Sequence, residues 1–176
     1  MNRILIALLL ITFFAGNVFS QEAKTKPSDS VKVSSNPEGK SPIKSLTPDE
    51  YIGYKTGSGM GLARVAELNN YPGPLRVLEL QKELKLSSLQ KSQLKTVVDA
   101  MKFKVLEMGG FILLQEKKMN ELFASGKADE GSIIYFTNKL GLYQAELRNA
   151  HLQAHLKTRR ILTPDQVKKY NKIKGY

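Results

Sequence analysis

The chain has 176 residues, 27 basic against 16 acidic side chains, a formal net charge of +11 at pH 7, two histidines and no cysteine. The absence of cysteine excludes thiolate metal sites and thiol redox chemistry. The positive charge favours acidic partners: an anionic membrane surface, nucleic acid or acidic client proteins. We expect no nucleic-acid partner, because the chain begins like an exported protein and such proteins rarely meet nucleic acid.

The first twenty residues have the pattern of a secretory signal. A basic start at Arg3 precedes an apolar run from Ile4 to Ala15, and Val18 and Ser20 suit the positions before a cleavage site. The run is too short to span a membrane. We predict a signal peptide over residues 1–20, export to the periplasm and no lipid anchor, because no cysteine follows. An uncleaved anchor is the alternative.

Cleavage would leave 26 basic and 16 acidic residues, a formal charge of +10. Residues 21–45 are rich in Ser, Pro and Lys and contain few apolar side chains. Such a segment cannot bury enough surface to offset the entropy of ordering. We predict a flexible leader here, with a binding segment as the alternative, and a helical domain over residues 46–176.

Three helix-start signals divide this domain. Each combines a leucine, a hydroxyl side chain that caps the first turn, and an acid or amide three residues later, which closes a capping box. The three boxes are Leu46-Thr47-x-x-Glu50, Leu86-Ser87-x-x-Gln90 and Leu162-Thr163-x-x-Gln166.

Apolar residues recur at three and four throughout the domain, which predicts helices and no strands. Helices are expected over residues 47–54, 61–68, 75–84, 88–125, 129–160 and 164–173. The short turn after Gly126 makes the two long helices an antiparallel hairpin. Gly109-Gly110 predicts a bend, or a place where another helix approaches closely.

The inward face of each long helix follows from this period. For the first we expect Leu94, Val97, Val98, Met101, Val105, Met108, Ile112, Met119, Leu122 and Phe123. For the second we expect Ile133, Phe136, Leu140, Tyr143, Leu147, Ala150 and Ala154, and for the last short helix Val167, Tyr170 and Ile173.

His151 and His155 are the best candidates for metal binding. Four residues apart on a helix, they lie on one face and can share a transition-metal ion such as zinc, copper, nickel or cobalt. Two imidazoles make a weak site, so a third ligand is needed. We place Glu79 third, with Glu67 and Met60 also considered. Alternatively, His151 packs in the core while His155 is solvated.

A second candidate site is basic. Cationic residues crowd the end of the chain, where they could contact acidic clients or anionic lipid, or simply be a solvated surface. The residues singled out are Arg159, Arg160, Lys168, Lys169 and Lys172.

Several motifs occur together in this chain: the two Leu-[Ser/Thr]-x-x-Gln boxes, the stretches 59–63 and 66–69, the Tyr71-Pro-Gly-Pro74 turn and the His-x-x-x-His motif. In this combination the chain resembles the Spy/CpxP family of periplasmic proteins, in particular its heavy-metal-sensor branch. The resemblance covers residues 46–176. It implies a cradle-shaped dimer of helical hairpins and a role in metal response or chaperoning. Metal-sensing relatives carry further histidines, whereas this chain has Arg76 where one is expected.

The residues show no nucleophile paired with a base and no metalloprotease motif, so we expect no enzyme activity. Two functions remain: heavy-metal response through the histidines, or ATP-independent binding of unfolded proteins on a basic concave face. A weaker third hypothesis is docking on a membrane sensor protein.

Overall fold

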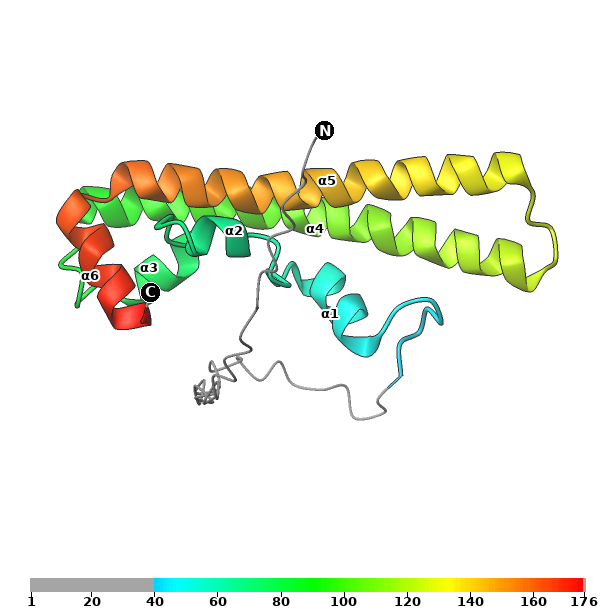
Figure 1. The fold of residues 1–176 in the computed structure, drawn as a ribbon, viewed down its shortest axis with the longest axis horizontal. Coiled ribbons are helices and arrows are strands. Elements are labelled where there is room, and N and C mark those ends of the chain that lie inside the picture. Colours follow the sequence, from blue (N-terminus) through cyan, green and yellow to red (C-terminus); the bar gives the residue numbers. More distant parts are fainter. Residues whose placement is uncertain (1–39, 176) are drawn as a thin grey trace, which may run out of the picture. The chain divides into compact units, whose positions relative to one another are not determined.

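The structure, a computed structural model, describes residues 40–175, which contain six helices and no strand (Figure 1). The all-helical prediction is therefore confirmed over this range. The predicted signal peptide and most of the predicted leader lie outside the described residues. Ile43 is buried, and a turn joins its carbonyl to the amide of Leu46. The packed part of the chain thus begins a few residues before the predicted boundary.

The helices follow the predicted order. They are α1 (Pro48–Thr56), α2 (Arg64–Glu67), α3 (Pro74–Glu79), α4 (Ser88–Ala124), α5 (Glu130–Ile161) and α6 (Pro164–Lys174). The 37-residue α4 and the 32-residue α5 run side by side as the predicted hairpin (Figure 1). The short helices α1 and α3 pack on α4, and α2 packs on α5. Among the described helices, none is long and apolar enough to cross a membrane.

Every predicted helix cap is present. Thr47, Ser87 and Thr163 each accept a hydrogen bond from the amide three residues on, and the side chain there accepts one from the cap amide. Asp129 forms the same reciprocal pair with Ser132 at the start of α5. Each cap stabilises its helix by about 1 kcal/mol.

The two glutamine boxes also bind each other. The side-chain amide of Gln90 donates to Oε1 of Gln166 at 2.8 Å and to the carbonyl of Ile161 at 3.0 Å. The amide of Gln166 donates to Oε1 of Gln90 and to the carbonyl of Leu84, both at 3.1 Å. This amide pair joins the start of α4 to the start of α6.

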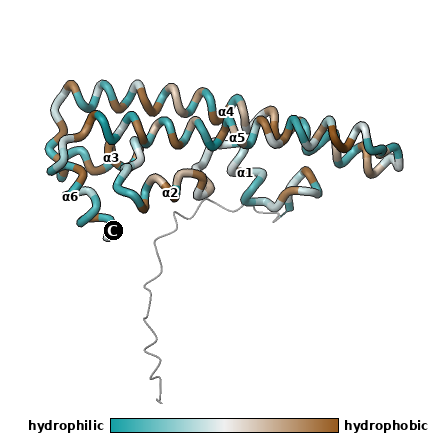
Figure 2. The backbone as a smooth tube through the Cα atoms, turned by 45° about the horizontal axis from the view of Figure 1, so that its top comes forward, coloured by the Kyte–Doolittle hydropathy of each residue, from teal (hydrophilic) through white to brown (hydrophobic). Residues whose placement is uncertain are grey.

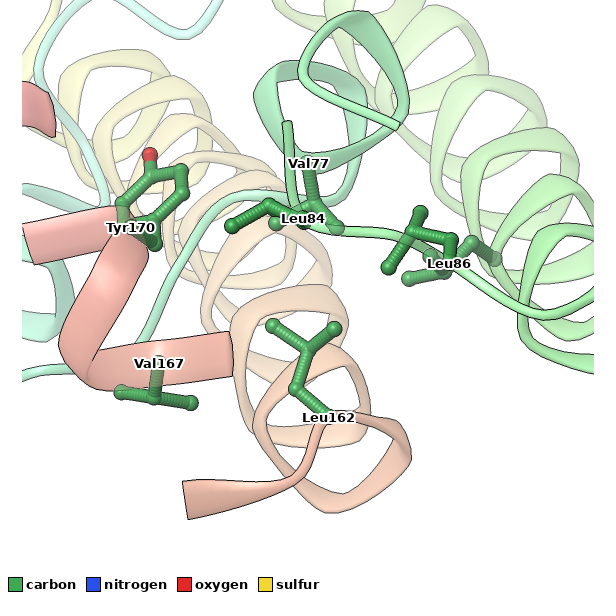
Figure 3. Close-up of a cluster of buried hydrophobic side chains, with 7 residues drawn as sticks. Val77, Leu84, Leu86, Leu162, Val167 and Tyr170 are labelled. Carbon is green, nitrogen blue, oxygen red and sulfur yellow. The ribbon is translucent and has the colours of Figure 1, made fainter. Parts of the chain in front are cut away.

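Two apolar clusters form the core. The first lies beside the amide pair, where side chains from α3, the start of α4, the end of α5 and α6 meet (Figure 3). The second lies between α4 and α5, and hydrophobic residues recur among hydrophilic ones along both helices (Figure 2). It contains Met101 and Met108, with Met119 packed against it, so these methionines serve packing as expected.

Gly109, on α4, lies against the end of α1. A Cβ atom at Gly109 would stand 2.1 Å from the backbone carbonyl oxygen of Tyr54. The predicted close approach of another helix is therefore confirmed, and α4 continues through the glycine pair as one helix. Gly110, by contrast, is exposed and has no atom within 4 Å of such a Cβ.

Some predicted details were wrong. The third helix ends at Glu79 rather than Leu84, because the chain turns through a left-handed Lys85 to bury Leu84 and Leu86 in the first cluster. Phe123 and Ile133 are exposed, because the hairpin extends past α1 near its turn (Figure 1). Ile173, near the end of α6, is also exposed.

A histidine-lined cavity as candidate metal site

His151 and His155 lie one turn apart on α5, on the side that the segment between α2 and α3 covers. Each residue is only 5% exposed. The alternative in which His155 is solvated is therefore wrong. Both rings line one cavity of about 200 Å³.

The orientation of the His155 ring is fixed by the backbone. Its Nδ1 lies 2.8 Å from the carbonyl oxygen of Tyr71, which can only accept a hydrogen bond. In the neutral tautomer that fits this contact, Nδ1 donates to the carbonyl and Nε2 keeps its lone pair. A carbonyl bonded to the second ring nitrogen is the usual support of a metal-binding histidine. The rigid segment Pro72–Pro74 is buried and holds this carbonyl in place.

His151 has an unsatisfied polar atom. Its Nε2 is buried and has no hydrogen-bond partner. A buried polar atom without a partner costs about 1–3 kcal/mol, so it calls for an explanation. Burial lowers the pKa of His151, and the neighbouring His155 lowers it further. The ring is therefore neutral at pH 7, which is the form that binds a metal ion.

Two further donors line the same cavity: the carboxylate of Glu67 on α2 and the thioether of Met101 on α4. Gly73 lies between the first of these donors, Glu67, and the ring of His155. A Cβ atom on Gly73 would stand 3.3 Å from Nε2 of His155 and 3.9 Å from Oε1 of Glu67. The absence of a side chain at Gly73 therefore keeps the space between these two groups open.

The other predicted third ligands lie elsewhere. Glu79, at the exposed end of α3, is not among the lining residues and pairs with the guanidinium of Arg76. Met60 packs over Gly53. Within residues 40–175, no three His, Cys, Asp or Glu side chains form a metal-binding group. The two imidazoles fit a transition metal, but the ligand set they begin is incomplete.

The predicted basic residues lie at the end of α5 and on α6. Lys168, Lys169 and Lys172 are exposed on α6, and Arg159 is half-buried. Arg160 lines a separate groove of about 360 Å³ between the start of α4 and the end of α5.

From sequence, the two histidines were candidates and Glu79 stood ahead of Glu67 as third ligand, whereas the Tyr71 carbonyl, Gly73 and Met101 were not among the candidates. The Tyr-Pro-Gly-Pro turn was the one signal that could have pointed to them, because a buried rigid turn brings backbone carbonyls to fixed positions.

Comparisons with family models, curated proteins and solved structures found no match. The resemblance to the Spy/CpxP family thus stays a prediction, and a functional proposal depends on the geometry of the cavity.

Proposed function

We propose that this chain is an exported, non-enzymatic protein that binds a divalent transition metal through His151 and His155 and acts in the response to heavy metals. Nε2 of each ring would hold the ion. The protein would supply two imidazoles, a backbone carbonyl that orients one ring, and a covered cavity.

The observation that supports the proposal is the unpartnered, buried Nε2 of His151, one helical turn from the buried ring of His155, whose Nδ1 contacts the Tyr71 carbonyl. A histidine kept only for packing gains nothing from an unsatisfied nitrogen, since an apolar side chain of similar size would avoid the cost. A metal ion would satisfy both nitrogens at once.

Isothermal titration tests the proposal. Chelator-stripped mature protein is titrated with zinc, copper, nickel and cobalt, beside the double variant His151→Ala/His155→Ala. We expect saturable binding at micromolar concentration or below in the native chain and none in the variant. Circular dichroism of both proteins controls for folding. Equal affinity in a folded variant would refute the assignment.

A second candidate function is the ATP-independent binding of unfolded proteins, and it has its own observation. On α4, Leu89 is 68% exposed and Phe103 is 72% exposed, which is unusual for large apolar side chains. The groove lined by Arg160 also contains Lys157, and neither has an ion-pair partner in the described part of the chain. Exposed apolar side chains and unpaired cations on one protein suit acidic, unfolded clients.

This function is tested by aggregation assays at low salt with an equimolar client. The variant Phe103→Ser/Leu89→Ser should lose the protection that the native chain gives, while the histidine variant should keep it. A native chain that protects no client would count against the function.

Assembly follows from the same apolar surface. We propose a homodimer, because apolar side chains exposed on α4 and α5 of one copy could be covered by a second copy. Light scattering at micromolar concentration should give twice the chain mass, and a monomer would contradict the proposal. Docking on a membrane sensor protein remains a further proposed role, for which no single residue offers a test.

A further inference from the structure

A groove follows the seam between α4 and α5, on the side of α5 away from the histidine cavity. Lys157 lines the groove and His155 lines the cavity, and side chains two positions apart on a helix point about 200° apart. The groove has two parts, of about 360 Å³ and about 160 Å³. Val97 and Lys157 line both parts, so the two parts adjoin along the seam.

The lining of this seam groove is mostly apolar. Val97 and Ile161 line the larger part, and the smaller part is lined by Val97, Ala100, Met101, Ala150 and Ala154. Along α4 the groove extends from Gln93 to Lys104, which spans about 16 Å at about 1.5 Å per residue. One acyl chain has about this length, because two of them end to end fill the roughly 30 Å hydrocarbon core of a bilayer.

Unpaired cations lie at one end of the seam groove. Arg160 and Lys157 line its larger part, and both side chains are exposed. Neither has an ion-pair partner within residues 40–175. At the other end, by contrast, Lys104 is paired with Glu107 at 2.9 Å. The positive charge that is available to a ligand is therefore confined to the end at Arg160.

This arrangement fits a ligand that has an anionic head and an apolar chain. The larger part has the volume of a small-molecule site, for which the usual range is about 300–1,000 Å³. Arginine binds a carboxylate through two parallel hydrogen bonds, and an apolar lining favours methylene groups over water. A small polar anion would leave the apolar lining in water, and a neutral lipid would leave both cations unpaired.

We propose that the seam groove binds a long-chain carboxylate, that is, a fatty-acid anion. Its carboxylate pairs with Arg160 and Lys157, and its chain lies along the seam toward Lys104. The seam groove is separate from the histidine cavity, so this inference does not depend on metal binding. A protein that binds no fatty acid can still bind a metal ion.

Displacement of cis-parinaric acid, a fluorescent long-chain carboxylate, tests the proposal. Mature protein is saturated with this probe, and octanoate, dodecanoate or myristate is added below the concentration at which it forms micelles. We expect affinity to rise about two- to fourfold for each added methylene, which corresponds to half to full burial of the methylene. Dodecanol has the same chain as dodecanoate without the charge, and it should bind about tenfold more weakly.

Three variants separate the head from the chain. Arg160→Gln/Lys157→Gln should weaken myristate binding about tenfold and abolish the preference for dodecanoate over dodecanol. The matched control Lys168→Gln/Lys169→Gln removes the same charge from exposed positions on α6 and should bind myristate like the native chain. Ala100→Phe keeps every cation but fills the smaller part, so it should weaken myristate and leave octanoate unchanged. Circular dichroism checks that each variant is folded.

Every other outcome overturns the proposal. An equal loss in the α6 control would mean that a basic protein attracts anions without a site. Affinity that does not depend on chain length, or a folded Ala100→Phe variant that binds myristate normally, would exclude the chain from the seam. Tighter binding of myristoyl lysophosphatidylglycerol than of myristate would replace the carboxylate by a phospholipid. Displacement of the probe by an acidic amphipathic peptide of Leu and Glu, more readily than by myristate, would assign the groove to a protein partner.

Discussion

The two adjacent glycines of α4 should respond in opposite directions to the same substitution. Alanine favours a helix over glycine by about 0.5–1 kcal/mol. Gly110 has open space around its missing side chain, so Gly110→Ala should stabilise the protein by that amount. At Gly109 the new methyl group would stand 2.1 Å from the carbonyl oxygen of Tyr54.

That oxygen belongs to the backbone and cannot rotate away, so α1 would have to shift by about 1 Å to restore van der Waals contact. Overpacking of this kind costs about 1–3 kcal/mol. After the gain in helix propensity, Gly109→Ala should still destabilise the protein by about 1–2 kcal/mol.

Urea denaturation followed by circular dichroism measures both changes, with native protein as the reference. In thermal melts, 1 kcal/mol corresponds to about 3 °C for a domain of this size. The melting temperature should rise for Gly110→Ala and fall for Gly109→Ala. If both variants move in the same direction, α1 does not lie against α4 as the structure shows.

Three further predictions concern stability. Gln90→Ala and Gln166→Ala should each lower the free energy of unfolding by about 1–2 kcal/mol. Because the two side chains share hydrogen bonds, a double-mutant cycle in urea should show a coupling energy above about 0.5 kcal/mol. Additive losses would contradict the amide pair. Burial lowers the pKa of His151 below 6.5, so the unfolded chain binds more protons than the folded one. The free energy of unfolding of metal-free protein should therefore fall as pH falls below 6.5. His151→Gln should flatten this dependence of stability on pH. Lys85 has φ 49°, so Lys85→Gly should raise the urea midpoint by the equivalent of about 0.5–1 kcal/mol, and a lower midpoint would disprove strain there.

The fold was largely predictable because its signals are local. A capping box involves only residues that are close in sequence, so Ser87 and Thr163 indicate where their helices begin without knowledge of tertiary contacts. Exposure near the hairpin turn was not predictable in this way. Phe123 continues the apolar period of α4, but within residues 40–175 no third element covers that end of the hairpin. Periodicity does not show which part of a helix packs against another element.

The candidate site was predictable only in part, for a related reason. The spacing of His151 and His155 follows from one helix, whereas the partners of a site come from other elements. Sequence places Glu79 and Glu67 equally well, and only packing brings Glu67 to the cavity. The Tyr71 carbonyl has no signature of its own in sequence, because every residue has one, and only the Pro-Gly-Pro turn that follows it indicates a fixed backbone there.

The amide pair between Gln90 and Gln166 has a consequence for the order of folding. It joins residues 76 positions apart, and closing a loop of that length costs about 4 kcal/mol of chain entropy. Local helix formation, the α4–α5 packing and the first apolar cluster bring its ends together, so we expect the pair to form after them. The pair should therefore be absent from the folding transition state. Loss of the amide pair should leave the folding rate almost unchanged and accelerate unfolding. The pair would then determine the lifetime of the native hairpin rather than the rate at which it forms.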